Sequence, residues 1–239
     1  MTNYDSVVLP NYDSVVLPNY DSVVLPNYEE IIEPNQILTK ADALKLKYID
    51  NQSEEICIRA VQKYGLALEY VKNKTKNICI IAIQEDGLAL KYVDIKTEDL
   101  CLMAVQRYGK VLEYIQEQNP NICEKAVEQN GMALQFVQSQ FLTEDICKIA
   151  VAQNGLALKF VQSQFLTEDI CKIAVAQNGM ALRFVQSQVL TEDICKIAVA
   201  QNGMALSFVK NKTKEICKLA IEQNSLAQQY IKKNFKYFS

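Results

Sequence analysis

The chain of 239 residues contains no histidine and no tryptophan, and it has no run of about 18 apolar residues. Without histidine it lacks the usual general base, the usual imidazole metal ligand and the side chain that titrates near neutral pH. These absences exclude an imidazole-dependent enzyme and leave a membrane span unsupported. The opening MTNYDSVVLP has neither a basic nor an apolar leader region, which predicts that no secretory signal peptide is present.

Glycine is also scarce, and its positions show the period of the chain. The eight cysteines are separated by gaps of 22, 22, 22, 24, 24, 24 and 22 residues, and each of the seven glycines follows a cysteine by eight positions. Residues 141–164 and 165–188 differ at only two positions. A fixed period of this length indicates tandem copies of one supersecondary unit. The cysteines are Cys57, Cys79, Cys101, Cys123, Cys147, Cys171, Cys195 and Cys217.

A cysteine at the same place in every repeat suggests a disulfide, a metal ligand or a buried thiol. Equivalent positions in stacked repeats lie about 8–10 Å apart, whereas a disulfide needs Cα atoms within about 7 Å of each other. The chain has no CxxC pair and no histidine, which disfavours structural zinc. We therefore expect buried, reduced thiols in a reducing compartment, with no metal and no cofactor.

Each repeat carries the sequence signals of two helices. A Ser, Thr or Asn stands four residues before every cysteine as an N-cap, and acidic residues often fill the first turn. The glycine is expected to adopt the left-handed conformation that ends the first helix. A shorter second helix follows, such as LALKF after Gly155. Apolar residues cover about half of each helix, so each pair must be packed between neighbours.

These signals predict an all-α protein, a right-handed or irregular α-solenoid of about eight two-helix repeats of 22–24 residues, over residues 35–239. One helical hairpin of this size cannot bury its own apolar surface, but a stack of eight builds one continuous core. The first unit is degenerate, with Ala43 in the glycine position. The longer repeats carry a leucine before the cap, such as Leu166, that is placed to staple onto the helix it precedes.

Residues 1–34 form a different repeat, with NYDSVVLP three times and then the variant NYEEIIEP. A proline every eight residues excludes a continuous helix, and six acids without a base give this segment a charge of −6. The composition predicts a low-complexity tail that is extended or disordered. It is either a product of sequence slippage or a docking array in which four tyrosines bind one partner multivalently. These tyrosines are Tyr4, Tyr12, Tyr20 and Tyr28.

Two sets of polar positions are candidates for contact with a partner. Gln and Asn precede the glycine in the C-terminal repeats and could hydrogen-bond an extended peptide or bases. The structural alternative is that Asn suits a helix end and Gln a solvated turn. A variable position in the second helix carries charges of both signs, which argues against a uniform nucleic-acid groove. The candidate residues are Gln153, Asn154, Gln177, Asn178, Gln201, Asn202, Lys159 and Arg183.

The repeats resemble those of the domain-of-unknown-function 4116 family. The resemblance rests on ALKLKYIDNQSEEICIRAVQKYGLALEYVKNKT and the later TEDICKIAVAQNG blocks, which keep the cap, cysteine, Ala-Val and glycine of the family consensus LxYVKNQTEEICLxAVKQNG in register over residues 41–230. The family is known mainly from giant DNA viruses and intracellular bacteria of amoebae. The resemblance therefore implies a viral or bacterial protein that acts as an effector inside a eukaryotic host, and it assigns no catalytic residue.

Two classes of function remain open. The preferred one is a non-enzymatic scaffold in the cytoplasm, of the host cell if the protein is an effector, that binds host proteins along its extended surface. The alternative is a nucleic-acid-binding helical-repeat protein, favoured only by the basic stretch 210–239. A carboxylate-based enzyme is disfavoured because the acids recur at helix starts, where the helix dipole accounts for them. These observations predict no particular oligomeric state.

Overall fold

The computed structural model of the chain describes residues 35, 37 and 39–231. The chain divides into two units, Met1–Ile31 and Ile32–Ser239, and all described residues belong to the second unit. The predicted tail of residues 1–34 thus lies outside the described residues. The described part of the chain contains α-helices and 3-10 helices and no strand. An all-α fold is therefore confirmed.

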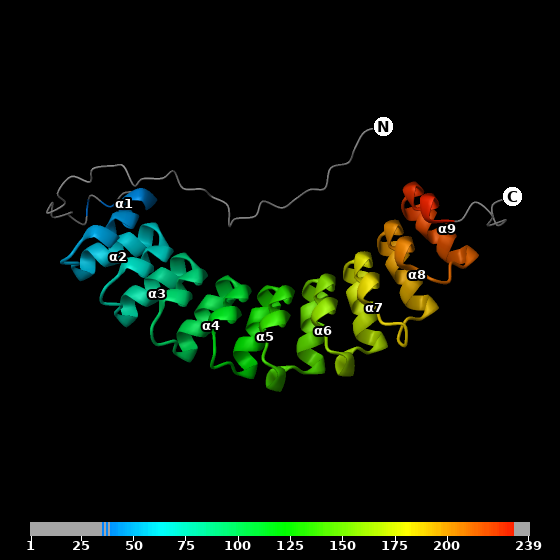
Figure 1. The fold of residues 1–239 in the computed structure, drawn as a ribbon, viewed down its shortest axis with the longest axis horizontal. Helices are drawn as coiled ribbons and strands as arrows, with labels where there is room; N and C mark the ends of the chain where they lie inside the picture. The colour runs from blue at the N-terminus through cyan, green and yellow to red at the C-terminus, as the bar shows by residue number, and fades with distance from the viewer. Residues whose placement is uncertain (1–34, 36, 38, 232–239) are drawn as a thin grey trace. The chain divides into compact units, whose positions relative to one another are not determined.

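Each full repeat consists of a ten-residue α-helix followed by a six-residue 3-10 helix (Figure 1). A short first unit, α1 (Lys40–Leu44) with η3 (Lys45–Tyr48), precedes eight full repeats in the described chain. The α-helices of these repeats are α2 (Glu54–Lys63), α3 (Lys76–Glu85), α4 (Glu98–Arg107), α5 (Pro120–Gln129), α6 (Glu144–Gln153), α7 (Glu168–Gln177), α8 (Glu192–Gln201) and α9 (Lys214–Gln223). The 3-10 helices are η4 (Gly65–Tyr70), η5 (Gly87–Tyr92), η6 (Gly109–Tyr114), η7 (Gly131–Phe136), η9 (Gly155–Phe160), η11 (Gly179–Phe184), η12 (Gly203–Phe208) and η13 (Ser225–Tyr230), and single turns at η8 (Ser139–Phe141) and η10 (Ser163–Phe165) lie in the linkers.

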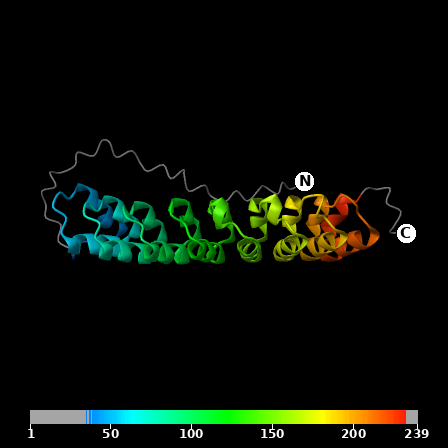
Figure 2. The same cartoon turned by 90° about the horizontal axis from the view of Figure 1, so that it is seen from below.

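The repeats pack only on their neighbours along the chain. Each α-helix lies beside the preceding and following α-helices, and it contacts the 3-10 helix of its own repeat and that of the repeat before it. Within this unit the α-helices form one layer and the 3-10 helices a second, as the edge view in Figure 2 shows. Contacts confined to adjacent repeats define an α-solenoid, so this prediction is also confirmed.

The core repeats the same few positions in every unit. In α6 the buried residues are Ile146, Cys147, Ala150 and Val151. The following 3-10 helix adds Ala157 and Leu158 at 0% and 2% exposure, and Leu166, in the staple position of the next repeat, is 7% exposed. All eight cysteines are buried and free. The interpretation of the cysteines as small apolar core residues is therefore confirmed.

The predicted left-handed glycines are wrong, because no described residue has a positive φ. The α-helix ends at Gln153, Asn154 is extended (φ −148°, ψ 106°), and Gly155 starts the 3-10 helix. A Cβ on Gly155 would overlap the backbone oxygen of Ala174 in the next repeat. Even the most open of the seven glycines, Gly87, leaves only 2.9 Å between such a Cβ and the oxygen of Ala104. Glycine is therefore required by the close approach of two repeats.

The exceptions in the glycine position support this account. Ser225 occupies it in the last described repeat, where no described helix follows, and the exposed Gln228 replaces the leucine that is buried in other repeats. In the first unit Ala43 is part of α1, so it does not start a 3-10 helix. Glycine is thus present wherever a six-residue 3-10 helix is followed by another described repeat.

We predict that Gly155→Ala lowers the free energy of unfolding by about 3 kcal/mol, because a Cβ there must displace the backbone of α7. Ser225→Ala is the matched control, and we expect a change within about 0.5 kcal/mol for it. Urea unfolding followed by circular dichroism measures both. Equal effects at the two positions would contradict the account of the glycines.

We also predict that deletion of residues 165–188, one whole repeat, leaves a folded solenoid. Gly155 would then face Ala198 and Gln201, which are the same residue types as Ala174 and Gln177. The shortened chain should unfold cooperatively, with a urea midpoint somewhat below that of the full chain. Removal of residues 165–176, half a repeat, is the control that should abolish folding; similar stability of the two deletions would argue against independent repeats.

Candidate interaction surface

The predicted glutamines connect one repeat to the next. Gln177, the last residue of α7, accepts the N–H of Gly155 through Oε1 at 2.6 Å, and its Nε2 donates to the carbonyl of Gln153 at 3.4 Å. Gln153 binds Gly131 and Gln201 binds Gly179 through the same atoms. These side chains are exposed to solvent, and in addition both ends of each amide bond to the previous repeat. A contact of their exposed surface with a partner stays a prediction.

The predicted asparagines cap the 3-10 helices. Oδ1 of Asn154 accepts the N–H of Leu156 at 3.0 Å, and Asn178 and Asn202 make the same bond to Met180 and Met204. An asparagine two residues before the bonded N–H satisfies a donor that the first turn leaves free. The Gln-Asn-Gly segment between the α-helix and the 3-10 helix, which we call the repeat junction, is thus held by its own hydrogen bonds.

The predicted basic residues lie on the 3-10 helices and cover aromatic rings. Nζ of Lys159 is 4.5 Å from the ring centre of Phe160, and the guanidinium carbon of Arg183 is 4.5 Å from that of Phe184. Lys91 has the same relation to Tyr92 at 4.5 Å. A cation at this distance is attracted to the face of the ring. Each of these pairs presents both a charge and an aromatic edge at the surface.

These basic residues occupy the same exposed position in their 3-10 helices. Residues three apart are eclipsed in a 3-10 helix, so Leu156 lies directly over Lys159 while Leu158 points into the core. We call the surface formed by the positions of Leu156, Lys159 and Phe160 in each repeat the 3-10 face. Its first position holds Leu66, Leu88, Lys110, Met132, Leu156, Met180, Met204 and Leu226, its second Glu69, Lys91, Glu113, Gln135, Lys159, Arg183, Ser207 and Gln229, and its third Tyr70, Tyr92, Tyr114, Phe136, Phe160, Phe184, Phe208 and Tyr230.

The apolar and aromatic members of the 3-10 face are the functional candidates that sequence reasoning missed. The aromatic residues are half-buried and pack on the core with one edge exposed, and six of the eight residues at the first position are half-buried Leu or Met. The signal was in the sequence, because these residues recur one and five positions after each glycine. The same period that indicates a core also fits a row of half-exposed side chains.

The charge at the second position of the 3-10 face changes from repeat to repeat. Glu69, Lys91 and Glu113 alternate in sign in the first repeats, whereas Lys159 and Arg183 are both basic. Burial raises the pKa of Tyr92, and the hydrogen bond between Lys91 and Tyr92 raises the pKa of Lys91. The lysine is therefore charged and the tyrosine neutral at physiological pH.

The cysteine thiols have low reactivity at neutral pH. Burial raises the pKa of every one of the eight thiols, to about 11 for Cys123, Cys147 and Cys171. The thiolate is the nucleophilic and metal-binding form, so a raised pKa suppresses both reactions at neutral pH. These residues serve the core.

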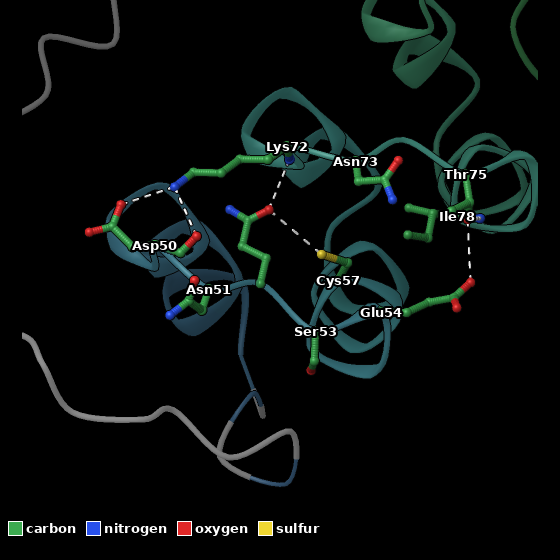
Figure 3. A pocket seen from close by; sticks show the side chains of 10 residues that line it. Asp50, Asn51, Ser53, Glu54, Cys57, Lys72, Asn73, Thr75 and Ile78 are labelled. Carbon is green, nitrogen blue, oxygen red and sulfur yellow. Dashed lines mark hydrogen bonds and ion pairs between the residues drawn. The ribbon is translucent and has the colours of Figure 1, made fainter.

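A cavity of about 510 Å³ lies where two linkers meet the starts of α2 and α3 (Figure 3). Its polar groups bind one another: Lys72 Nζ is 3.0 Å from Asp50 Oδ1, and Gln52 Oε1 accepts the backbone N–H of Lys72 at 2.8 Å. A similar cavity of about 340 Å³ lies between the starts of α8 and α9. The cavities follow from the repeated linkers, and they carry no cluster of reactive groups.

Two classes of site are not formed by the residues that the structure describes. Over residues 39–231 no three His, Cys, Asp or Glu side chains gather closely enough to hold a metal ion. In the same part of the chain, no helix combines the length and the apolar character needed to span a bilayer.

Comparison with known proteins places the chain in a family. The model of the family described as "Domain of unknown function (DUF4116)" matches residues 53–97, 75–118, 97–142, 119–166 and 143–190. These overlapping matches cover more than half of the chain, one per pair of adjacent repeats, and the chain belongs to this family. No curated protein and no solved structure matches it.

The raised pKa values of the thiols predict how the free energy of unfolding depends on pH. Because folding raises the pKa of Cys123, Cys147 and Cys171 from 9.0 to about 11, their contribution is fully present below pH 9 and is lost as the pH rises towards 11. The free energy of unfolding should fall over this range. A chain with all three changed to Ala should show a shallower fall in urea unfolding; an unchanged slope would contradict the assignment.

Proposed function

We propose that the protein is a non-catalytic α-solenoid that binds a protein partner along its 3-10 face. The observation that carries the proposal is the difference between two nearly identical repeats of the chain. The repeats 141–164 and 165–188 differ only by Leu156 against Met180 and by Lys159 against Arg183. Both differences fall on the 3-10 face, one 3-10 turn apart. Variation between these two copies is thus confined to one half-buried and one exposed position of the 3-10 face.

The composition of the 3-10 face also supports the proposal. Protein interfaces are enriched in aromatic residues, Met and Arg, and exposed apolar stripes bordered by polar residues mark binding surfaces. The face has Met132, Met180 and Met204 at its first position in three of the repeats, beside half-exposed phenylalanines and the two basic residues. Methionine is flexible and polarisable, so it adapts to an irregular partner surface.

The exposed acids favour a structural role over catalysis. Glu144 is in the first turn of α6, where the helix dipole stabilises it, and its carboxylate is 2.8 Å from Nζ of Lys148 one turn later. Glu168 and Lys172 repeat this pair at 2.8 Å in α7. Charges used in this way in successive helices are not a catalytic constellation.

The family resemblance extends the proposal to a setting. A viral or bacterial effector inside an amoeba would meet host proteins as partners, in the host cytoplasm. Eight free, buried thiols fit such a reducing compartment. The N-terminal tyrosines, which lie outside the described residues, would supply a second attachment point.

We predict that a photo-crosslinking residue at position 159 captures a protein from amoeba lysate, whereas one at position 176, on the exposed side of α7, does not. Changing both Lys159 and Arg183 to Glu should then weaken binding of the captured protein by tenfold or more, about the cost of losing interface hot spots. The chain with both Ala176 and Ala200 changed to Glu is the matched control and should bind unchanged.

Two outcomes would reject the proposal. Equal loss of binding in both double variants would show that the 3-10 face is not the site. Binding of RNA or DNA at about 50 mM salt that weakens steeply as salt is added would favour the nucleic-acid alternative suggested by the basic stretch 210–239.

A further inference from the structure

Four repeat junctions contain the dipeptide Asn-Gly, at Asn130, Asn154, Asn178 and Asn202. Asparagine before glycine is the sequence most open to spontaneous deamidation, because glycine has no side chain to hinder attack by its nitrogen on the carboxamide. We infer that these pairs are latent modification sites: stacking of the repeats holds them closed, and they deamidate only when a junction opens.

The chemistry requires only water. The Gly nitrogen loses its proton and bonds to the asparagine Cγ, the bond from Cγ to the amide nitrogen breaks, and ammonia leaves, which forms a five-membered succinimide. One water molecule then opens the ring at either carbonyl and yields aspartate or isoaspartate. The first step needs a free Gly N–H and a backbone that brings this nitrogen to the side-chain carbon.

In the folded junction the Gly nitrogen is not available to attack the asparagine side chain. The N–H of Gly155 is buried and donates to Gln177 Oε1 at 2.6 Å, so base cannot remove its proton. Gly131, Gly179 and Gly203 make the same bond to a glutamine at 2.6, 2.6 and 2.5 Å. Leaving a buried N–H without an acceptor costs free energy, so the hydrogen bond between the glycine and the glutamine stays formed in the folded chain.

The backbone is also turned away from the reactive shape. Closing the ring places Cβ and the Gly nitrogen on the same side of the Cα–C bond, which for an L residue requires a strongly negative ψ. The four asparagines have ψ between 106° and 109°, and each Oδ1 accepts the N–H two residues on at 3.0 Å. The junction must therefore unfold before the ring can form.

The contacts that hold the Gly nitrogen come from the next repeat. Gln177 and the carbonyl of Ala174, which presses on Gly155, belong to α7, so separation of α7 from α6 releases them together. Every Asn-Gly pair in the chain is followed by a repeat with this glutamine. Gly65 and Gly87, whose following repeats carry Glu85 and Arg107 there, are preceded by tyrosine and aspartate instead.

Deamidation would make such an opening permanent. Isoaspartate adds a methylene to the backbone beside Gly155, at a contact that has no room for even a Cβ. The altered repeat could not stack again on its neighbour. The four junctions thus act as a chemical record of local unfolding along the solenoid.

The first test compares the unaltered full chain in its folded state and in urea. Trypsin releases the four asparagines in peptides of different sequence, so mass spectrometry follows each site separately. We expect deamidation at all four to be at least about tenfold slower in the folded chain, as junction opening is a local unfolding event. Equal rates in the two states would overturn the inference without any variant.

The second test removes the hydrogen bond between Gly155 and Gln177. Gln177→Ala should raise deamidation of Asn154 about tenfold, the factor that a lost hydrogen bond to a buried N–H corresponds to, and leave Asn130 and Asn202 unchanged. Gln177→Glu keeps an acceptor for the N–H and should stay near the unaltered rate. With circular dichroism showing a folded chain, an unchanged Asn154 or an equal rise at Asn202 would overturn the inference; if Gln177→Ala unfolds the chain, the first test decides.

Discussion

The contact between the start of each 3-10 helix and the α-helix of the next repeat is the constraint on which the rest of the structure depends. At Gly155 the backbone of η9 lies so close to the carbonyl of Ala174 that no side chain fits between them. This approach lets the glutamine of the next repeat reach the Gly N–H. The adjacent α-helices also pack on each other, and their cysteines are buried. Glycine, alanine and glutamine in the repeat are thus three parts of one contact.

Because this contact joins only neighbours, the energy of the solenoid is divided among its interfaces. Each repeat buries its α-helix against two 3-10 helices, its own and the one before it, and no contact between distant parts of the unit is needed. A defect therefore acts first at one junction. The near-identity of residues 141–164 and 165–188 fits this arrangement, since a copied repeat presents the same surfaces on both sides and needs no compensating change elsewhere.

Sequence reasoning succeeded where the cause was local and failed where the cause lay in another repeat. The period, the N-caps and the buried cysteines follow from signals within about ten residues, and Thr143 does accept the N–H of Ile146 at 3.2 Å. The conformation of Gly155 could not be found in this way, because a left-handed helix end and a tight contact both select glycine. Its partner, Ala174, is 19 residues away. The hydrogen bond of Gln177 to Gly155 in the previous repeat was missed for the same reason.

The same distinction explains why the candidate surface was identified only in part. Lys159 and Arg183 stand out in the sequence because they vary, whereas Leu156 and Phe160 resemble core residues with the same period. The observed burial separates Leu158, which is 2% exposed in the core, from Leu156, which is half-buried and lies over Lys159. Each full 3-10 helix thus contributes to two parts of the structure: its first residue lies against the next repeat in seven of the eight, and its second and fifth residues belong to the 3-10 face. The stacking contacts and the proposed partner contacts thus involve different residues of the same 3-10 helix, so the residues proposed to contact a partner can change while the stacking contacts stay the same.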